Sequence, residues 1–334
     1  MAERIAVLGA GSWGMAVADL LDRGGHAVTL WEFDESEFRK LVKHRGQPEK
    51  LSDFQLGPSI ALTNDLQSAV STASLLVLAI PSQSLRSALR GIRDVLPGTG
   101  VVNLAKGIEV RTLKRMSEVI AEELGVDPRL VATLSGPSHA EEVVRGMPTA
   151  VVAAGVSRDF TAKLQEIFSN ASFRVYQSDD LVGVELGGSL KNIIAIGAGI
   201  AEGLGMGDNT LGAILTRGLA EITRLGVAMG AQPETFAGLS GIGDLITTCV
   251  SRHSRNRFVG DRIGRGERLE NVLAGMTMVA EGVQTTRSGH ELAGQHEVEM
   301  PITDQVYHVL FEGKAPAEAV EQLMERKLKP EIWK

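Results

Sequence analysis

Residues 5–14 read Ile-Ala-Val-Leu-Gly-Ala-Gly-Ser-Trp-Gly, and this stretch decides the fold expected of the chain. The apolar residues 5–8 predict a buried strand, and Gly9, Gly11 and Gly14 follow it at the start of a helix predicted over 13–23. The first glycine permits a tight turn, the second lets the backbone approach a pyrophosphate, and the third lets helix and strand pack closely. The context therefore predicts a dinucleotide site with its phosphates at the helix N-terminus.

An acidic residue stands at the second diagnostic position of such a site. Glu32 directly follows the next predicted strand, 27–31, and lies 23 residues after the first glycine. A carboxylate there accepts hydrogen bonds from the adenosine ribose and repels a 2′-phosphate. No Lys or Arg lies between Glu32 and Phe38 to hold a 2′-phosphate. Arg39, Lys40 or a residue distant in sequence can still fold back to do so. We therefore expect NAD or NADP as cofactor, with NAD favoured.

Apolar runs alternate with helical patterns through the first half of the chain. Further strands are predicted at 27–31, 75–79, 101–103, 130–133, 149–153 and 173–176, and helices at 113–124 and 158–168. Such alternation is typical of an α/β, Rossmann-type domain with helices on both faces of a doubly wound, mostly parallel sheet. Only helices are predicted afterwards, at 184–200, 211–229, 274–292, 302–312 and 316–327. We expect a dinucleotide-binding domain at 1–182 and a helical substrate-binding domain at 183–334.

Composition narrows the class of protein and its compartment. The 334 residues are 43% hydrophobic and 22% charged, as in soluble globular proteins. The net charge of −7 and the absence of basic runs argue against nucleic acid. One cysteine, Cys249, and no metal-ligand spacing predict a reducing, cytoplasmic setting without a metal. The apolar run 193–201 is bounded by charges at 191 and 202, so we expect no membrane span.

Several segments along the chain carry a more specific pattern than the glycine turn alone. They are GAGSWG at 9–14, NLAKG at 103–107, SGPS at 135–138, VELGGSLKN at 184–192, TRGL at 216–219, GLSGIGD at 238–244, SRNR at 254–257 and EGV at 281–283. Together these segments resemble the bacterial NAD(P)-dependent glycerol-3-phosphate dehydrogenases. The resemblance weakens at 45–58, where the family commonly has an Asn-x-x-Tyr-Leu-Pro segment and this chain reads RGQPEKLSDFQLGP.

The resemblance implies an oxidoreductase that transfers hydride between NAD(P)H and dihydroxyacetone phosphate to give sn-glycerol 3-phosphate, in the direction that supplies phospholipid synthesis. It makes Lys191 the proton acceptor or donor. The residues agree, because Lys191 lies in the mostly apolar segment 190–196, where desolvation lowers the pKa of an ammonium group. His139, beside Ser138, is the weaker candidate for the same role.

The resemblance also assigns binding residues. Substrate contacts are implied for Lys106, Gly136, Ser138, Lys191, Asn192, Asp244, Ser254, Arg255 and Asn256. Cofactor contacts are implied for Gly9, Gly11, Ser12, Trp13, Gly14, Glu32, Phe33, Lys106, Ala140, Arg255, Val279 and Glu281. The guanidinium fork of Arg255 suits a phosphate monoester that the rest of an acidic protein repels, and an exposed salt bridge is its alternative role. Asn192 either binds substrate or caps local backbone.

Two other functions stay open at this point. A β-hydroxyacid or 6-phosphogluconate-type dehydrogenase shares the two-domain plan and a helix-borne lysine. A dinucleotide-sensing regulator binds the cofactor without hydride transfer, although Lys191, Asp244 and Arg255 together argue against it. We expect a homodimer, because a helical second domain presents apolar faces. Cys249 is expected to be a buried small hydrophobe, and His253 stands near Ser254 by sequence only.

Overall fold

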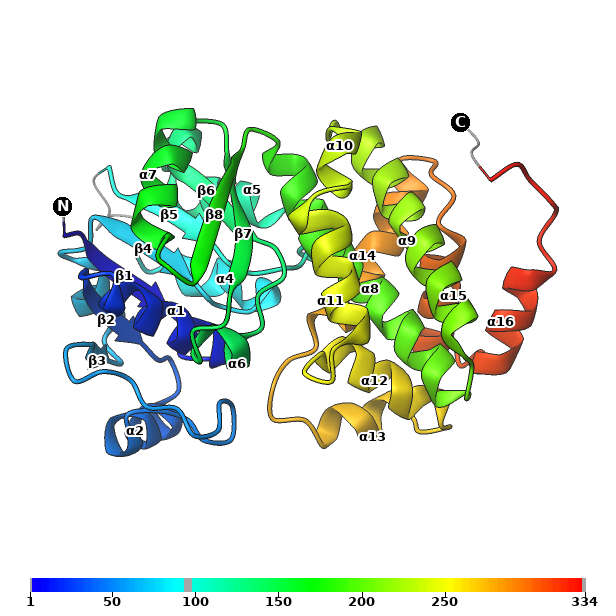
Figure 1. Cartoon of the computed structure of the whole chain (residues 1–334), viewed down its shortest axis with the longest axis horizontal. Helices are drawn as coiled ribbons and strands as arrows, with labels where there is room; N and C mark the ends of the chain where they lie inside the picture. The colour runs from blue at the N-terminus through cyan, green and yellow to red at the C-terminus, as the bar shows by residue number, and fades with distance from the viewer. Residues whose placement is uncertain (1, 93–97, 332–334) are drawn as a thin grey trace.

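The computed structural model describes residues 2–92 and 98–331. Strands and helices alternate in its N-terminal part, and the rest is helical (Figure 1). The strands are β1 (Arg4–Leu8), β2 (Ala27–Trp31), β3 (Ala61–Thr63), β4 (Leu75–Leu78), β5 (Gly100–Asn103), β6 (Val131–Ser135), β7 (Thr149–Gly155) and β8 (Phe173–Ser178). In the described chain they make one sheet in the order β3-β2-β1-β4-β5-β6-β7-β8. Among the strand pairs of the described residues, only β6 and β7 run antiparallel, so the mostly parallel, doubly wound sheet is confirmed.

Helices cover both faces of the sheet. On β1, Ile5 and Val7 pack into one core while Ala6 and Leu8 pack into the core on the opposite face. The first core is shared by α1 (Ser12–Arg23), α2 (Glu35–His44), α6 (Ala140–Val143) and α7 (Arg158–Phe168). The second core is shared by α3 (Leu66–Val70), α4 (Ser82–Leu89) and α5 (Met116–Leu124). The parallel strands β1, β2, β4, β5 and β6 consequently end at one common edge, where their loops meet.

The helical lobe, drawn from green to red in Figure 1, is built around α8 (Leu181–Gly203). Its other helices are α9 (Asp208–Ala228), α10 (Pro233–Phe236), η3 (Leu239–Gly243), α11 (Asp244–Val250), α12 (Arg255–Gly264), α13 (Leu269–Ala274), α14 (Glu281–Gln295), α15 (Pro301–Phe311) and α16 (Pro316–Met324). By length and composition α8 is apolar enough to cross a membrane, but 89% of its most apolar window is buried inside the protein. That burial is typical of the central helix of a folded domain.

Glycines let α8 and α12 approach each other at backbone distance. A Cβ atom on Gly199 would lie 2.1 Å from the carbonyl oxygen of Arg257, and one on Gly260 would lie 2.1 Å from that of Ile196. Gly203 and Gly264 leave equally little room one helical turn further along. Glycine makes up 38 of the 334 residues, about 11% against a usual level near 7%. Part of this excess therefore serves close helix packing around α8.

A buried carboxylate joins the two lobes. Glu185, on α8, accepts hydrogen bonds from the backbone N–H of Ser117 at 2.8 Å and from its hydroxyl at 2.6 Å. The Arg115 guanidinium lies 2.7 Å from the same carboxylate. Both partners belong to the start of α5 in the sheet lobe, so the first turns of α8 are fixed against that lobe.

The structure corrects two of the predicted elements. The helix expected over 274–292 begins only at Glu281, as α14, because residues 275–280 are not helical and Ala274 is the last residue of the unpredicted α13. The segment between them crosses to the other lobe, which no periodicity in the sequence indicates. The helix expected over 113–124 begins only at Met116. Leu113 has a positive φ of 58°, so the backbone there is incompatible with an α-helix.

Replacing Gly260 by alanine tests the close packing of α8 and α12. The added methyl group has to displace backbone, so Gly260→Ala is expected to lower the free energy of unfolding by about 1–3 kcal/mol. Gly212→Ala is the matched control, since a Cβ on this helical glycine meets none of the described atoms within 4 Å. The control is expected to raise stability by about 0.5–1 kcal/mol. Urea unfolding of both variants would contradict this packing if their shifts had the same sign.

Candidate active site

Each glycine of the turn after β1 has its own steric reason. Gly9 has a φ of +107°, a conformation that residues with a side chain rarely adopt. A Cβ on Gly14 would lie 1.8 Å from the Gly9 carbonyl oxygen, whereas a Cβ on Gly11 would meet none of the described atoms within 4 Å. No described side chain caps α1 at Gly11. The first N–H groups of α1 and the open space before them therefore fit the phosphates of a dinucleotide.

A cleft of about 730 Å³ runs from this turn to the helical lobe. The sequence-predicted residues that line it from the sheet lobe are Gly9, Gly11, Ser12, Trp13, Gly14, Glu32, Phe33, Lys106, Ser138 and Ala140. Those from the helical lobe are Lys191, Asn192, Asp244, Ser254, Arg255, Asn256, Val279 and Glu281. Gly136 is the exception, and its carbonyl oxygen instead accepts hydrogen bonds from Lys106 Nζ at 2.9 Å and Ser138 Oγ at 3.0 Å.

One carboxylate holds a lysine from each lobe. Asp244 Oδ1 lies 2.6 Å from Lys191 Nζ, and Asp244 Oδ2 lies 2.8 Å from Lys106 Nζ. Asp244 is 2% exposed and Lys191 is 5% exposed. Burial opposes ionisation of Asp244, but the charges of Lys106 and Lys191 outweigh it and keep its pKa below the ordinary value. The two ammonium groups thus converge on one point of the cleft, where the Asp244 carboxylate offsets their mutual repulsion.

Lys191 projects from α8 into a buried site that lowers its pKa below that of a surface lysine. Burial lowers the pKa of Lys191 to about 8, and the charge of Asp244 opposes that fall. Thr248 Oγ1 lies 2.5 Å from the same Nζ atom. Thr248 was not predicted from the sequence, although its place four residues after Asp244 on α11 is the signal that finds it. With two of its N–H groups used by these partners, the ammonium group keeps one for a ligand.

Two side-chain amides extend this network. Asn192 Nδ2 donates to the Lys106 carbonyl oxygen at 3.1 Å, and Asn256 Nδ2 donates to Asn192 Oδ1 at 2.8 Å. Asn256 Oδ1 accepts a hydrogen bond from the Gly282 N–H at 2.9 Å. These bonds fix the orientation of both amides and tie α8, α12 and α14 to the loop after β5.

The N-terminus of α12 brings a guanidinium group to the cleft. Ser254 caps this helix, because its Oγ accepts a hydrogen bond from the Arg257 N–H at 3.2 Å. Burial lowers the pKa of Arg255, and the charges of Glu281 and Glu141 oppose that effect. Within the described chain, the Arg255 guanidinium makes no hydrogen bond or salt bridge, so it is available for an anion.

Both halves of the chain match models of a single family. Residues 4–161 match the N-terminal part, and residues 180–321 the C-terminal part, of the NAD-dependent glycerol-3-phosphate dehydrogenases. The chain belongs to this family. The resemblance expected from the sequence motifs is thereby confirmed.

Individual relatives agree with the family models over nearly the full chain. A glycerol-3-phosphate dehydrogenase [NAD(P)+] from Thermoanaerobacter sp. is 53% identical, over 98% of this chain and 99% of its own length. One from Salinibacter ruber is 51% identical, over 100% and 97% of the two chains. The crystal structure of glycerol-3-phosphate dehydrogenase from Coxiella burnetii superposes with a TM-score of 0.93 at 36% identity, covering 97% of this chain and 99% of that one.

In this family member, Glu281 and the segment before it reach across to the sheet lobe. Glu281 Oε1 accepts a hydrogen bond from the Ser82 N–H at 2.9 Å, and its other oxygen binds the Ser82 hydroxyl. Met278 Sδ lies 3.2 Å from Ser12 Oγ at the glycine turn. Val279, 50% exposed, lines the cleft between these two contacts. The lining around the dinucleotide turn is therefore completed by residues from the helical lobe.

Glu32 and Phe33, directly after β2, line the cleft on the sheet-lobe side. Phe33 is 81% exposed, and its ring centroid lies 6.2 Å from that of Trp31. The sequence left open a role for Arg39 and Lys40 beside a 2′-phosphate. Both are on α2, where they pair with acids of the same helix at 3.0 and 2.8 Å, and neither lines the cleft.

The sequence also drew attention to two histidines and the cysteine, at positions 139, 253 and 249. Burial and the charge of Lys191 lower the pKa of His139, whose buried Nε2 has no partner among the described residues. The ring of His253 lies 5.8 Å from that of His139. Cys249 is 1% exposed and burial raises the pKa of its thiol to about 12, so it packs as an unreactive apolar residue. The described residues hold no cluster of three His, Cys, Asp or Glu side chains suited to a metal.

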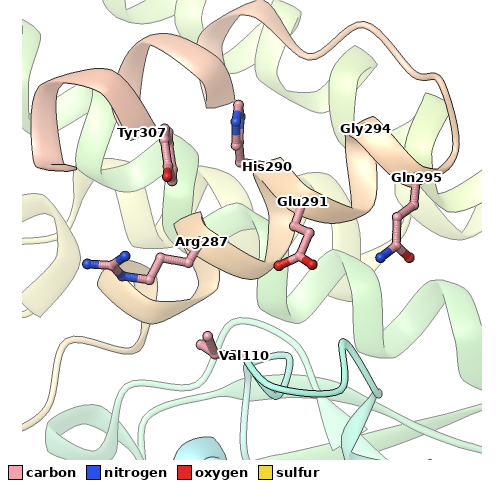
Figure 2. Close-up of a pocket in the computed structure, with 7 residues that line it drawn as sticks. All are labelled: Val110, Arg287, His290, Glu291, Gly294, Gln295 and Tyr307. Atoms are coloured by element: carbon pink, nitrogen blue, oxygen red, sulfur yellow. The ribbon is translucent and has the colours of Figure 1, made fainter. Parts of the chain in front are cut away.

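A second hollow, of about 610 Å³, lies between α14, α15 and the loop after β5 (Figure 2). His290 stacks on Tyr307 with ring centroids 4.0 Å apart, and Arg287 lies over the Phe311 ring at 3.7 Å. Val110 faces them from the other lobe (Figure 2). None of the sequence-predicted site residues lines this hollow, so the dinucleotide cleft remains the candidate active site.

Replacing Gly11 by alanine tests whether the open space at α1 receives the cofactor. The fold has room for the methyl group, so the melting temperature of Gly11→Ala is expected to stay within a degree or two of the wild type. The methyl group blocks close approach of pyrophosphate and weakens NADH binding at least about tenfold, as expected for a lost charge-assisted hydrogen bond. Fluorescence titration with NADH measures this, and unchanged affinity would place the phosphates elsewhere.

Proposed function

We propose that this protein transfers hydride between NAD(P)H and dihydroxyacetone phosphate, giving sn-glycerol 3-phosphate. One observation carries the proposal: Asp244 holds Lys106 and Lys191 together in the cleft that begins at the dinucleotide turn. Reduction of a ketone needs a hydride for its carbon and a proton for its oxygen. The bound nicotinamide supplies the hydride. The family to which the chain belongs is named for NAD and for glycerol 3-phosphate, the product of this reduction.

We assign the proton to Lys191. Its ammonium group, with two N–H groups used by Asp244 and Thr248, has a third to donate to the ketone oxygen. A pKa of about 8 lets the same residue give a proton in reduction and take one in alcohol oxidation near neutral pH. Lys106 Nζ, held by Asp244 and the Gly136 carbonyl, likewise retains one N–H that stabilises negative charge on the substrate oxygen.

We assign the substrate phosphate to the start of α12. Arg255 offers an uncommitted guanidinium, and Asn256 keeps one amide N–H beyond its bond to Asn192. The backbone N–H groups of this helix N-terminus, other than the Arg257 N–H that Ser254 caps, add to the attraction for a dianion. Ser254 acts through its cap of this helix, and Ser138 through its bond to Gly136, near the substrate.

We assign the cofactor to the turn Gly9 to Gly14 with Ser12 and Trp13, and to Glu32 and Phe33 at its adenosine end. Ala140, Val279, Glu281, Lys106 and Arg255 complete this side of the cleft. Glu32 at the end of β2 favours NAD over NADP, because a 2′-phosphate would meet its carboxylate. Arg39 and Lys40, paired on α2, offer no compensation.

Further proposals concern the setting of the enzyme. The division near residue 182 into a dinucleotide-binding and a helical substrate-binding domain is supported by the start of α8 at Leu181. A homodimer is supported by exposed apolar side chains on the helical lobe, among them Val250 at 57% and Phe258 at 45%. A reduced, cytoplasmic location is supported by the free Cys249, and a role in phospholipid synthesis by the glycerol phosphate product.

Steady-state assays of NADH and NADPH oxidation test the function and the role of Lys191. Dihydroxyacetone phosphate is the expected substrate, and Lys191→Met is expected to lower kcat by about 10²–10⁴ while NADH affinity is kept. Turnover of a β-hydroxyacid or of 6-phosphogluconate with none of dihydroxyacetone phosphate would overturn the proposal. NADH binding without turnover of any of these would favour the dinucleotide-sensing regulator.

The lowered pKa of Lys191 predicts how kcat depends on pH for ketone reduction and for alcohol oxidation, and the same assays measure both. Reduction needs the ammonium form, so kcat is expected to fall as pH rises through about 8. Oxidation of glycerol 3-phosphate needs the neutral amine, so its kcat is expected to rise over the same interval. Profiles that change in the same direction would contradict the assignment.

A further inference from the structure

The loop at 45–58, where the chain departs from the family pattern, is seated on the dinucleotide turn. The Lys50 carbonyl oxygen accepts a hydrogen bond from Ser12 Oγ at 2.8 Å, at the first residue of α1. Leu51 and Leu56 are 2% and 3% exposed and anchor the loop in the sheet-lobe core. Arg45 binds the Ile60 carbonyl oxygen at 3.0 Å. The loop is thus a packed wall of the cleft, close to the adenosine end.

Within this loop, Gln47 is buried although its amide is only partly used. The side chain is 2% exposed, and its Oε1 atom has no hydrogen-bond partner among the described residues. Its Nε2 atom lies 3.5 Å from Glu32 Oε2, at the long end for a hydrogen bond. Burying an amide with an unpartnered oxygen disfavours folding, so a glutamine at this position points to a role other than stability.

The contact partner of Gln47 is the residue that meets the adenosine ribose in the proposed function. Glu32 Oε1 accepts a hydrogen bond from the Asp34 N–H at 3.1 Å, which leaves Oε2 to Gln47. The carboxylate is therefore held from two sides at the mouth of the cleft. Without Gln47, the Asp34 N–H alone among the described residues holds this carboxylate, so a glutamate with three side-chain torsions gains freedom to turn into solvent.

The nearby cation that lines the cleft is already paired. Lys50 Nζ lies 3.0 Å from Glu37 Oε2, and Lys40 binds the other oxygen of Glu37 at 2.8 Å. A 2′-phosphate at this end therefore meets Glu32 before a cation that is free to move. A fixed carboxylate repels such a phosphate, whereas a mobile one turns away from it.

We propose that Gln47 is a specificity-determining residue, whose buried amide holds Glu32 towards the adenosine ribose and so selects NAD(H) over NADP(H). Gln47 acts through Glu32 and is a positioning residue. The inference rests on the proposed dehydrogenase function and on the NAD preference assigned to Glu32.

The test compares Gln47→Leu with Gln55→Leu, a matched change at an exposed glutamine of the same loop. The readout is the ratio of kcat/KM for NADH to that for NADPH, measured with dihydroxyacetone phosphate. Gln47→Leu is expected to lower this ratio about threefold to tenfold, chiefly by raising KM for NADH, as the loss of one long hydrogen bond of ordinary net strength predicts. Its melting temperature is expected to stay or rise, because the unpartnered amide is gone. Gln55→Leu is expected to change neither quantity.

A double-mutant cycle with Glu32→Ala separates the inference from the function on which it rests. In the Glu32→Ala background, Gln47→Leu is expected to change the ratio less than twofold. If Glu32→Ala lowers the ratio and Gln47→Leu does not, the role of Gln47 is wrong and the NAD preference of Glu32 stands. If Gln47→Leu lowers the ratio equally with and without Glu32, the positioning role is wrong. If neither variant moves the ratio, both assignments fail while turnover of dihydroxyacetone phosphate still supports the enzyme function.

Discussion

The shared carboxylate of Asp244 is the interaction on which the rest of the site depends. Two buried or half-buried lysines cannot both remain charged at one point of a cleft unless an anion compensates them. Asp244 does so at 2.6 and 2.8 Å, from the first turn of α11. Because Lys106 belongs to the sheet lobe and Lys191 to the helical lobe, the same contact fixes Lys191, the proposed acid-base group, relative to the glycine turn after β1.

The glycine-rich packing of the helical lobe makes that placement possible. Gly187 and Gly188 allow α8 to approach η3 and β6, since a Cβ on Gly187 would lie 2.7 Å from the Ser240 carbonyl oxygen and one on Gly188 would lie 2.5 Å from Ser135 Oγ. Gly199 and Gly260 do the same for α8 and α12 further along. The helix that carries Lys191 and Asn192 is therefore a rigid scaffold, and the network of side-chain amides extends its order to the N-terminus of α14. Rigid elements hold catalytic groups more accurately than loops do.

The fold and most of the cleft could be predicted because local sequence specifies them. The turn Gly9 to Gly14 is read from spacing alone, and the gathering of Lys106, Lys191 and Arg255 in one cleft follows the family motifs that carry them. Thr248 was missed although it lies four residues after Asp244, because a threonine on a helix is usually a packing residue. The sequence could not show that the chain leaves α13 to touch Ser12 before α14 begins, since that path is set by tertiary contacts with the other lobe. The antiparallel pairing of β7 has the same origin, because an apolar strand carries no signal of its direction.

The most direct measurement of the central claim is an NMR titration of the Lys191 side chain, in the wild type and in Asp244→Asn, which removes the shared charge while keeping the side-chain shape. The account predicts a pKa of about 8 for Lys191 in the wild type. Because the charge of Asp244 opposes the effect of burial, it predicts a clearly lower pKa in the variant. A Lys191 that titrates near the ordinary lysine value of about 10.4 in the wild type, or identically in both proteins, would contradict the account.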